Sequence, residues 1–344
     1  MGAALATVPI CEIGSRFLLA SLIALVALPA SAACEMHHRA EIPVLADHGQ
    51  LVTEGVINET SARVLIDTGA DVSLVWRPAI ERLGLRLINA PGRPKPFYGL
   101  GGETQLGSAF VDEFRVAAID VTHHRFAVAG DREGGLDFIL AEDLLSKTSM
   151  EFDLRHHAVR TMEFTGCTVS QLPYWAATYS ATDLLASPQD ALAIRTIVLV
   201  NGRSVRAQLD SGSSVSILSK SLADSLRVHY VSADESLVGI GRKSLQTWIA
   251  DVQSFTVGDE TIKSTQLRVA EMGKYRTTIR VGSRIPREVD GEPEMLLGLD
   301  FLRAHHVLVD NTSRKMVFTY EGGPVFETAG PPASTEPVAA PAQP

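Results

Sequence analysis

The chain contains an internal repeat, and this repeat constrains the fold more than any other feature of the sequence. With an offset of 143 residues, "VLIDTGADVSLV" from Val64 matches "AQLDSGSSVSIL" from Ala207. Each block ends an apolar run in an aspartate, Asp67 or Asp210, and continues with a turn-forming Thr-Gly or Ser-Gly pair. Two such blocks predict that one structural unit occurs twice and that the two aspartates meet.

Each aspartate block is followed by a glycine-rich hairpin and then by an apolar block. The hairpin sequences are "YGLGGET" from Tyr98 and "VGIGRKS" from Val238. The apolar blocks are "ILAEDLL" from Ile139 and "LLGLDFL" from Leu296, and each predicts a short strand followed by a short helix. Their offset is 157 residues, so the second repeat carries a longer insertion. Upstream, "INETSARVLID" and "VNGRSVRAQLD" each predict two strands joined by a tight turn.

The repeats and their flanks divide the chain into five parts. We expect a signal peptide over 1–32, a first lobe over 41–165, a linker over 166–190, a second lobe over 191–320 and a disordered Pro/Ala-rich tail over 321–344. The N-terminal run "FLLASLIALVAL" follows Arg16 and precedes "ASAA", as is typical of a secretory signal. It is too short for a comfortable membrane span. We therefore expect an exported protein, periplasmic or secreted, with no integral membrane span.

Two cysteines remain once Cys11 leaves with the signal peptide. Cys34 and Cys167 allow one disulfide, but two cysteines do not make a disulfide framework. The sequence therefore leaves open whether they are paired or free. Lipid attachment at Cys34 is the less favoured alternative, because the acylation motif normally has an aliphatic residue where Ser31 stands.

A pair of carboxyl groups held at hydrogen-bonding distance shares one proton and titrates as a unit. In that state the ionised member takes a proton from a bound water, and the protonated member polarises a carbonyl group. Asp67 and Asp210 are therefore the candidate catalytic residues, and no metal or other cofactor is expected. Five neighbours are expected to support them through small hydroxyls, sharp turns and backbone N–H donors, namely Thr68, Gly69, Ser211, Gly212 and Ser213.

These motifs resemble the retropepsin-like branch of the aspartic proteases, and two of them in one chain resemble the two lobes of pepsin. The resemblance implies a mainly β, two-lobed fold with a pseudo-twofold relation between tandem repeats. It also implies an aspartic endopeptidase in which each lobe provides one catalytic aspartate and a hairpin flap covers the substrate. The flap candidates are Tyr98, Gly99, Gly101, Gly102, Gly239 and Gly241.

One departure from the family pattern matters for function. The apolar-apolar-Gly motif behind the catalytic turn is intact at Gly298, but the first repeat has Ala141 at the matching position. The sequence does not decide whether the extra methyl group is absorbed or displaces the first turn. The alternative function is therefore a catalytically inactive, exported peptide-binding module that keeps the same fold.

Other classes of function find little support in the sequence. The chain has 31 Lys+Arg and 40 Asp+Glu, a net charge of −9, and no long basic run, which argues against a nucleic-acid partner. Adjacent histidines begin at His37, His123, His156 and His305. Neighbours in a strand face opposite ways and no metal-binding spacing accompanies them, so no metal is expected. The expected partner is a peptide or protein substrate. Both signatures lie in one chain, so we expect a monomer, with pairing of each lobe to its twin in another chain as the alternative.

Overall fold

The computed structural model describes residues 33–47, 49–88, 97–99, 102–104, 106–130, 135–186, 192–239, 244–272, 278–279, 287–288 and 293–326. The expected signal peptide, the end of the expected linker and most of the expected tail lie outside these ranges and stay predictions. Within the described ranges, no helix has the length and apolar character needed to span a bilayer.

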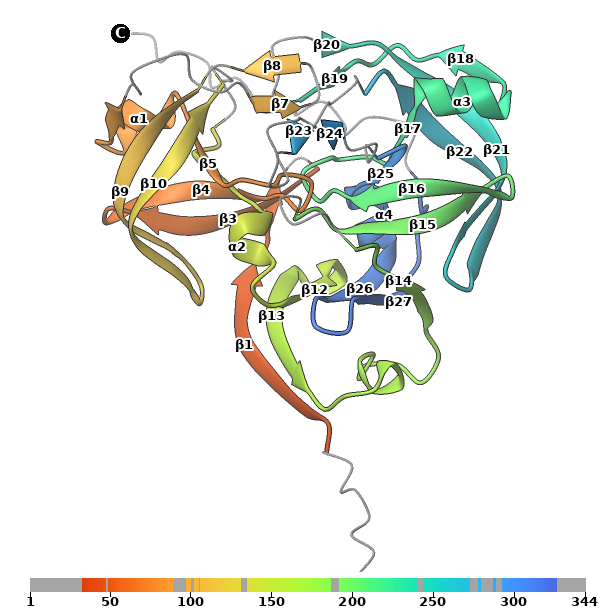
Figure 1. Ribbon diagram of the computed structural model, residues 1–344, viewed down its shortest axis with the longest axis horizontal. Helices are drawn as coiled ribbons and strands as arrows, with labels where there is room; N and C mark the ends of the chain where they lie inside the picture. The colour runs from red at the N-terminus through yellow and green to blue at the C-terminus, as the bar shows by residue number, and fades with distance from the viewer. Residues whose placement is uncertain are drawn as a thin grey trace, which may run out of the picture. The chain divides into compact units, whose positions relative to one another are not determined.

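The first lobe is an eight-stranded sheet in the order β2-β3-β4-β11-β5-β10-β9-β6 (Figure 1). β3 also pairs with β9, and this pairing closes the sheet into a barrel. Alternate residues of β4 are buried in the core, as the alternating sequence predicts. The elements are β2 (Leu45–Asp47), β3 (Gln50–Ile57), β4 (Thr60–Ile66), β5 (Leu74–Trp76), α1 (Ala79–Arg82), β6 (Arg86–Ile88), β9 (Leu106–Val116), β10 (Ile119–Ala129), β11 (Phe138–Leu140) and α2 (Glu142–Leu145).

The second lobe repeats this arrangement in the order β15-β16-β25-β17-β22-β21-β18, and β15 also pairs with β21. Every strand from β3 to β11 in the first barrel thus has a counterpart in the second, which confirms the mainly β, two-lobed fold built from tandem repeats. The elements are β15 (Arg195–Val200), β16 (Arg203–Leu209), β17 (Ile217–Ser219), α3 (Lys220–Leu226), β18 (Tyr230–Ser232), β21 (Thr247–Val257), β22 (Glu260–Ala270), β25 (Met295–Leu297) and α4 (Leu299–Ala304).

The tight turns that open the two lobes have the same backbone conformation. Asn58 and Glu59 join β3 to β4 with φ of 46° and 66°, and Asn201 and Gly202 join β15 to β16 with φ of 51° and 77°. Both turns therefore need left-handed backbone at two successive residues, for which Asn-Gly is the favoured pair. Only the second lobe has glycine in the second position.

We expect Glu59→Gly to raise the free energy of unfolding by about 1 kcal/mol, because a side chain at this φ is strained. The reciprocal change, Gly202→Ala, should lower it by a similar amount. Urea unfolding of both variants beside wild type measures the two effects. An unchanged or lower urea midpoint for Glu59→Gly would show that Glu59 is not strained.

A third sheet takes strands from both repeats and from the segment expected to be a linker. Its order is β1-β13-β12-β26-β27-β14 (Figure 1). β12 of the first repeat pairs directly with β26 of the second, and β14 of the expected linker pairs with β27. The elements are β1 (Glu35–Pro43), β12 (Ser149–Asp153), η1 (Leu154–His156), β13 (Ala158–Thr165), η2 (Val169–Gln171), β14 (Ser180–Asp183), β26 (His305–Asp310) and β27 (Lys315–Tyr320). The expected linker thus contributes β14 to this shared sheet in addition to connecting the repeats.

Both ends of the described chain are attached to the folded body. A disulfide joins Cys34, just before β1, to Cys167, just after β13. This bond uses the sulfur atom that lipid attachment to Cys34 would need. The expectation of a disordered tail from residue 321 is wrong over 321–326, because Phe326 is buried with its ring 4.9 Å from that of Phe255.

Two short hairpins lie at the expected flap positions. β7 (Phe97–Gly99) pairs with β8 (Gly102–Thr104), so three of the first flap candidates, Tyr98, Gly99 and Gly102, lie on its strands. β19 (Leu237–Val238) pairs with β20 (Ser244–Leu245), and Gly239 follows β19. The candidates at the two tips, Gly101 and Gly241, lie outside the described residues. A further hairpin of β23 (Thr278–Ile279) and β24 (Arg287–Glu288) occupies the insertion of the second repeat.

Candidate active site

The two aspartates occupy equivalent positions at the ends of buried strands. Asp67 follows β4, and its N–H donates to the carbonyl of Leu140 at 2.9 Å. Asp210 follows β16, and its N–H donates to the carbonyl of Leu297 at 2.8 Å. The bonds to β11 in the first repeat and to β25 in the second therefore fix where the chain turns after each aspartate. They also fix the position of its carboxyl group.

The structure brings the two carboxyl groups together, and they hydrogen-bond to one another. Each carboxyl also lies against the glycine of the opposite turn. A Cβ atom added at Gly69 would stand 2.3 Å from Cγ of Asp210, and one added at Gly212 would stand 2.4 Å from Cγ of Asp67. Glycine is therefore required at both positions for the carboxyl groups to meet.

Cross-links between the turns hold the pair in place. The N–H of Thr68 donates to Oγ of Ser211 at 3.0 Å, and the N–H of Ser211 donates to Oγ1 of Thr68 at 3.0 Å. Each hydroxyl then donates across to the opposite strand, Thr68 to the carbonyl of Leu209 at 3.0 Å and Ser211 to the carbonyl of Ile66 at 2.8 Å. Both side chains are buried. This reciprocal set of bonds fixes the spacing of the turns, which is the preorganisation that proton sharing needs.

Backbone donors surround each carboxylate. The N–H of Gly69 donates to Oδ1 of Asp67 at 2.8 Å, while the N–H groups of Gly212 and Ser213 donate to Oδ1 of Asp210 at 3.1 and 3.0 Å. The five expected supporting residues thus lie in the two turns, where they bond to the opposite turn or lie against a catalytic carboxyl group. Burial raises the pKa of both aspartates, and the charge of Asp67 raises that of Asp210 further. The pair therefore retains a proton at pH values where an isolated aspartate is ionised.

The sequence analysis missed a second set of hydrogen bonds, in which a serine donates to an aspartate behind each catalytic turn. Asp143 accepts from the N–H and Oγ of Ser73 at 2.9 and 2.5 Å. Asp300 accepts from the N–H and Oγ of Ser216 at 2.9 and 2.6 Å. The recurrence of this Ser and Asp in both repeats was the available signal.

The methyl group of Ala141 is absorbed without displacing the first turn. Ser73 Oγ accepts from the N–H of Ala141 at 2.9 Å, and Ser216 Oγ accepts from the N–H of Gly298 at 2.9 Å, so the two lobes make the same bond. Ala141 is fully buried in an apolar cluster of the first lobe against which Ala70 packs. The departure from the family motif therefore leaves the local geometry intact.

Two further contacts join the second lobe to the first catalytic turn, in addition to the reciprocal bonds between Thr68 and Ser211. Nε2 of Gln208 donates to the carbonyl of Gly69 at 3.0 Å, and the N–H of Leu192 donates to Oδ1 of Asp71 at 3.2 Å. At the position of Gln208 the first repeat has Leu65, whose side chain has no hydrogen-bonding group. Sequence reasoning missed these contacts because they break the repeat.

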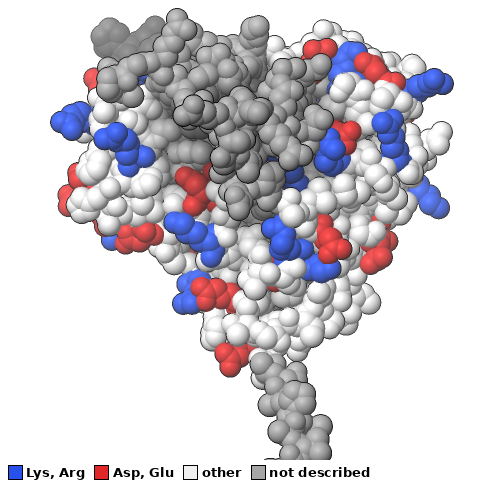
Figure 2. All heavy atoms as spheres, in the orientation of Figure 1, with Lys and Arg blue, Asp and Glu red and all other residues white. Residues whose placement is uncertain are grey.

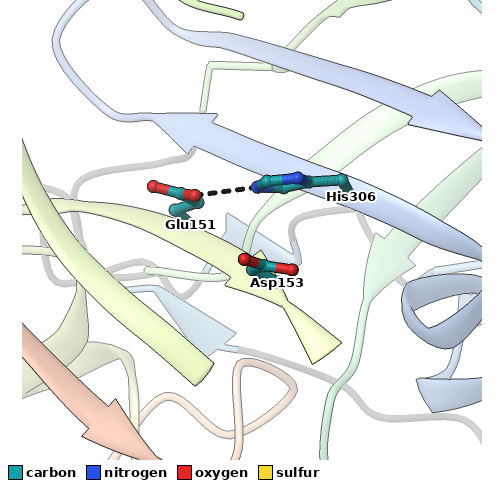
Figure 3. Close-up of side chains that lie close together, drawn as sticks. All are labelled: Glu151, Asp153 and His306. Carbon is teal, nitrogen blue, oxygen red and sulfur yellow. Dashed lines mark hydrogen bonds and ion pairs between the residues drawn. The ribbon is translucent and has the colours of Figure 1, made fainter. Parts of the chain in front are cut away.

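A buried group of acids and a histidine lies in the shared sheet, away from the catalytic turns in sequence. Figure 3 shows Glu151 and Asp153 on β12 beside His306 on β26, with Nε2 of His306 2.8 Å from Oε1 of Glu151. Nη1 of Arg160 lies 3.0 Å from that oxygen and 2.9 Å from Oδ2 of Asp153, so the protein supplies the cation. Burial raises the pKa of Glu151, but bonds from His306 and Tyr174 outweigh it and the net direction is down. These contacts are those of a satisfied charge network and do not point to a metal site.

Comparison with known proteins is consistent with the geometry of the two turns. The family model described as aspartyl protease matches the chain twice, over residues 53–144 and 196–301. The two matches together cover more than half of the chain, and each contains one Asp-Thr/Ser-Gly turn. A search of curated proteins found no match. The chain is therefore a tandem of two retropepsin-like repeats and belongs to the aspartyl protease family.

Proposed function

We propose that the protein is an aspartic endopeptidase that hydrolyses peptide bonds with water activated between Asp67 and Asp210. The observation that carries this proposal is the hydrogen-bonded contact of the two carboxyl groups, each seated on the glycine of the other turn. A shared proton gives the pair a base and an acid at the same place, as hydrolysis of an amide requires.

The reaction follows from the state of the pair. The ionised carboxylate takes a proton from water as the water oxygen attacks the carbonyl carbon of the substrate, while the protonated carboxyl transfers its proton to the carbonyl oxygen. A tetrahedral diol results. The carboxyl that took the water proton then transfers it to the amide nitrogen, and the other carboxylate takes a proton from one hydroxyl of the diol. Cleavage of the C–N bond releases an amine and a carboxylic acid, and the pair again holds one proton.

The geometry favours catalysis over the alternative of a binding module without activity. That alternative was motivated by Ala141, yet the bonds around Ala141 match those around Gly298. The cross-links between Thr68 and Ser211 join turns of the same chain, which supports an active monomer.

Incubation of the purified protein with an unstructured polypeptide between about pH 3 and pH 8 tests the proposal. We expect cleavage that is fastest below neutral pH and falls as pH rises, because the pair must keep one proton and its pKa values are raised. A statine peptide, which mimics the tetrahedral diol, should bind and inhibit. Peptide or statine binding without turnover at any pH would favour the noncatalytic binding module.

Export to the periplasm or the medium is also a proposal. It is supported by the signal-like N-terminal sequence and by the disulfide between Cys34 and Cys167, since disulfides persist in oxidising compartments. The expected partner is a peptide or protein substrate. On the face drawn in Figure 2, acidic and basic side chains are interspersed over the described residues, which gives no support to a nucleic-acid partner.

A further inference from the structure

Glu142 is a buried acid directly behind the first catalytic turn. It is the first residue of α2, its side chain is 1% exposed, and neither carboxylate oxygen has a hydrogen-bond partner among the described residues. Buried polar groups in proteins are nearly always paired, and an unpaired buried charge is strongly disfavoured. The side chain is therefore expected to carry a proton.

The backbone of Glu142 is connected to the main chain of Asp67 through a single residue. Its N–H donates to the carbonyl of Ala70 at 3.1 Å, and the N–H of Ala70 in turn donates to the main-chain carbonyl of Asp67 at 3.4 Å. The same N–H lowers the pKa of the Asp67 carboxyl group. A displacement of Glu142 would therefore move a donor of Asp67.

The second lobe has the same connection without the acid. The N–H of Leu299 donates to the carbonyl of Ser213 at 2.8 Å, and the N–H of Ser213 donates to the main-chain carbonyl of Asp210 at 3.2 Å. Since Leu299 occupies the position of Glu142, the connection itself needs no carboxyl group. The acid is an addition confined to the first lobe.

The groups that act electrostatically on Glu142 are acidic. They are Asp67 and Asp71 of the catalytic turn and Asp143 of the same helix. Burial, reinforced by these charges, raises the pKa of Glu142 to about 8. Arg195 at the start of β15 acts on Asp71, where it favours the charged form. The neighbourhood thus stabilises the neutral acid and disfavours its ionisation.

We propose that Glu142 is a positioning residue that supports the Asp67 turn as a neutral acid and releases this turn when it ionises. The inference rests on the proposed peptidase function for its effect on turnover. A charged Glu142 must reach solvent, and the bond to Ala70 that aligns Asp67 is lost as α2 moves. The first lobe alone then sets an alkaline limit to activity, on top of the loss of the shared proton.

The sign of the linked effect on stability follows from the raised pKa. Between the ordinary pKa of glutamate and about 8 the folded protein binds a proton that the unfolded chain has released. The contribution of Glu142 to the free energy of unfolding of the wild type therefore falls as pH rises through this window, and it stops falling above it. Glu142→Gln keeps the shape of the neutral acid and cannot ionise, so this contribution disappears.

Urea unfolding between about pH 4 and pH 9.5 compares wild type with Glu142→Gln and Glu142→Leu, the residue that the second lobe uses. The midpoint of Glu142→Gln minus that of wild type should increase from about pH 5 to about pH 8 and then level off. Glu142→Leu should give the same pH-dependent difference, so a folding defect of one variant leaves the other to decide. Glu81→Gln, on the exposed face of α1, is the matched control and should give a flat difference. A flat difference for both Glu142 variants would overturn the proposal.

Turnover provides the readout that separates positioning from stability alone. The ratio of kcat/KM at pH 8.5 to that at pH 6 should be at least about threefold higher in Glu142→Gln than in wild type, under conditions where both remain folded. Equal ratios would overturn the positioning role even if the midpoints behave as expected. If wild type and all variants fail to cleave any polypeptide, the peptidase proposal fails, and the urea midpoints still decide whether Glu142 is a neutral acid.

Discussion

Asp67→Asn and Asp210→Asn are each expected to lower kcat by at least about 10³-fold. An amide can occupy the place of the carboxyl group, but it can neither take the proton from water nor share one with its partner. Binding of a statine peptide should weaken far less than kcat falls, because the turn and the cleft remain. Steady-state cleavage of a fluorogenic peptide that the wild type cleaves, measured with the folded variants, gives kcat.

The structure also predicts that these two variants fold. Burial raises the pKa of both aspartates, and the charge of Asp67 raises that of Asp210 further, so a neutral amide removes a cost that the native carboxylates carry. The urea midpoint should stay unchanged or rise, and the exposed Asp112→Asn serves as a control that leaves both quantities unchanged. Cleavage at wild-type rate by either variant would end the proposed mechanism.

Gly298→Ala is expected to be strongly destabilising, because the added methyl group has no room behind the second catalytic turn. A Cβ atom at this position would lie 2.4 Å from both the carbonyl carbon and the oxygen of Val215, and 2.8 Å from the nitrogen of Ser216. These are backbone atoms of the segment that follows Asp210, and they cannot rotate away. We expect a loss of about 3 kcal/mol in the free energy of unfolding, together with loss of turnover.

The first lobe provides the matched control for this prediction. Ala141→Gly changes the same position in the direction of the family motif, and only a small buried methyl group is lost. We expect a decrease of about 1 kcal/mol and nearly unchanged kcat. Urea unfolding and peptide cleavage by both variants test the pair. A Gly298→Ala protein as stable as wild type would show that the strand behind Asp210 has more room than the structure indicates.

The repeat predicted most of the fold and the centre of the site. Alternation of apolar residues predicted the strands before Asp67 and Asp210, and the small hydroxyls of Thr68 and Ser211 suggested bonds between the turns. These features were predictable because each is local in sequence and occurs twice. The serine–aspartate pairs behind the turns also occur twice, but their contact spans 70 residues for Ser73 and Asp143 and could not be read from either residue alone.

Features without a counterpart in the other repeat were not predictable. Nothing in the local sequence distinguishes the buried Glu142 from the exposed first-turn acids that commonly begin helices. The same holds for the contact of Gln208 with the carbonyl of Gly69, because a glutamine in a strand is usually solvated. The partner of Cys34 was left open for a similar reason, since its pairing depends on the register of β1 with β13.

The shared six-stranded sheet has a consequence for how a newly made chain matures. β12 emerges early, yet its neighbour β26 is synthesised only after the whole second barrel, so the sheet cannot close until the polypeptide is nearly finished. Until then the edge of β12 stays open to incorrect partners. Conversely, a protease that cuts the finished molecule between the barrels would not separate the two repeats, because strands from both repeats are hydrogen-bonded in one sheet.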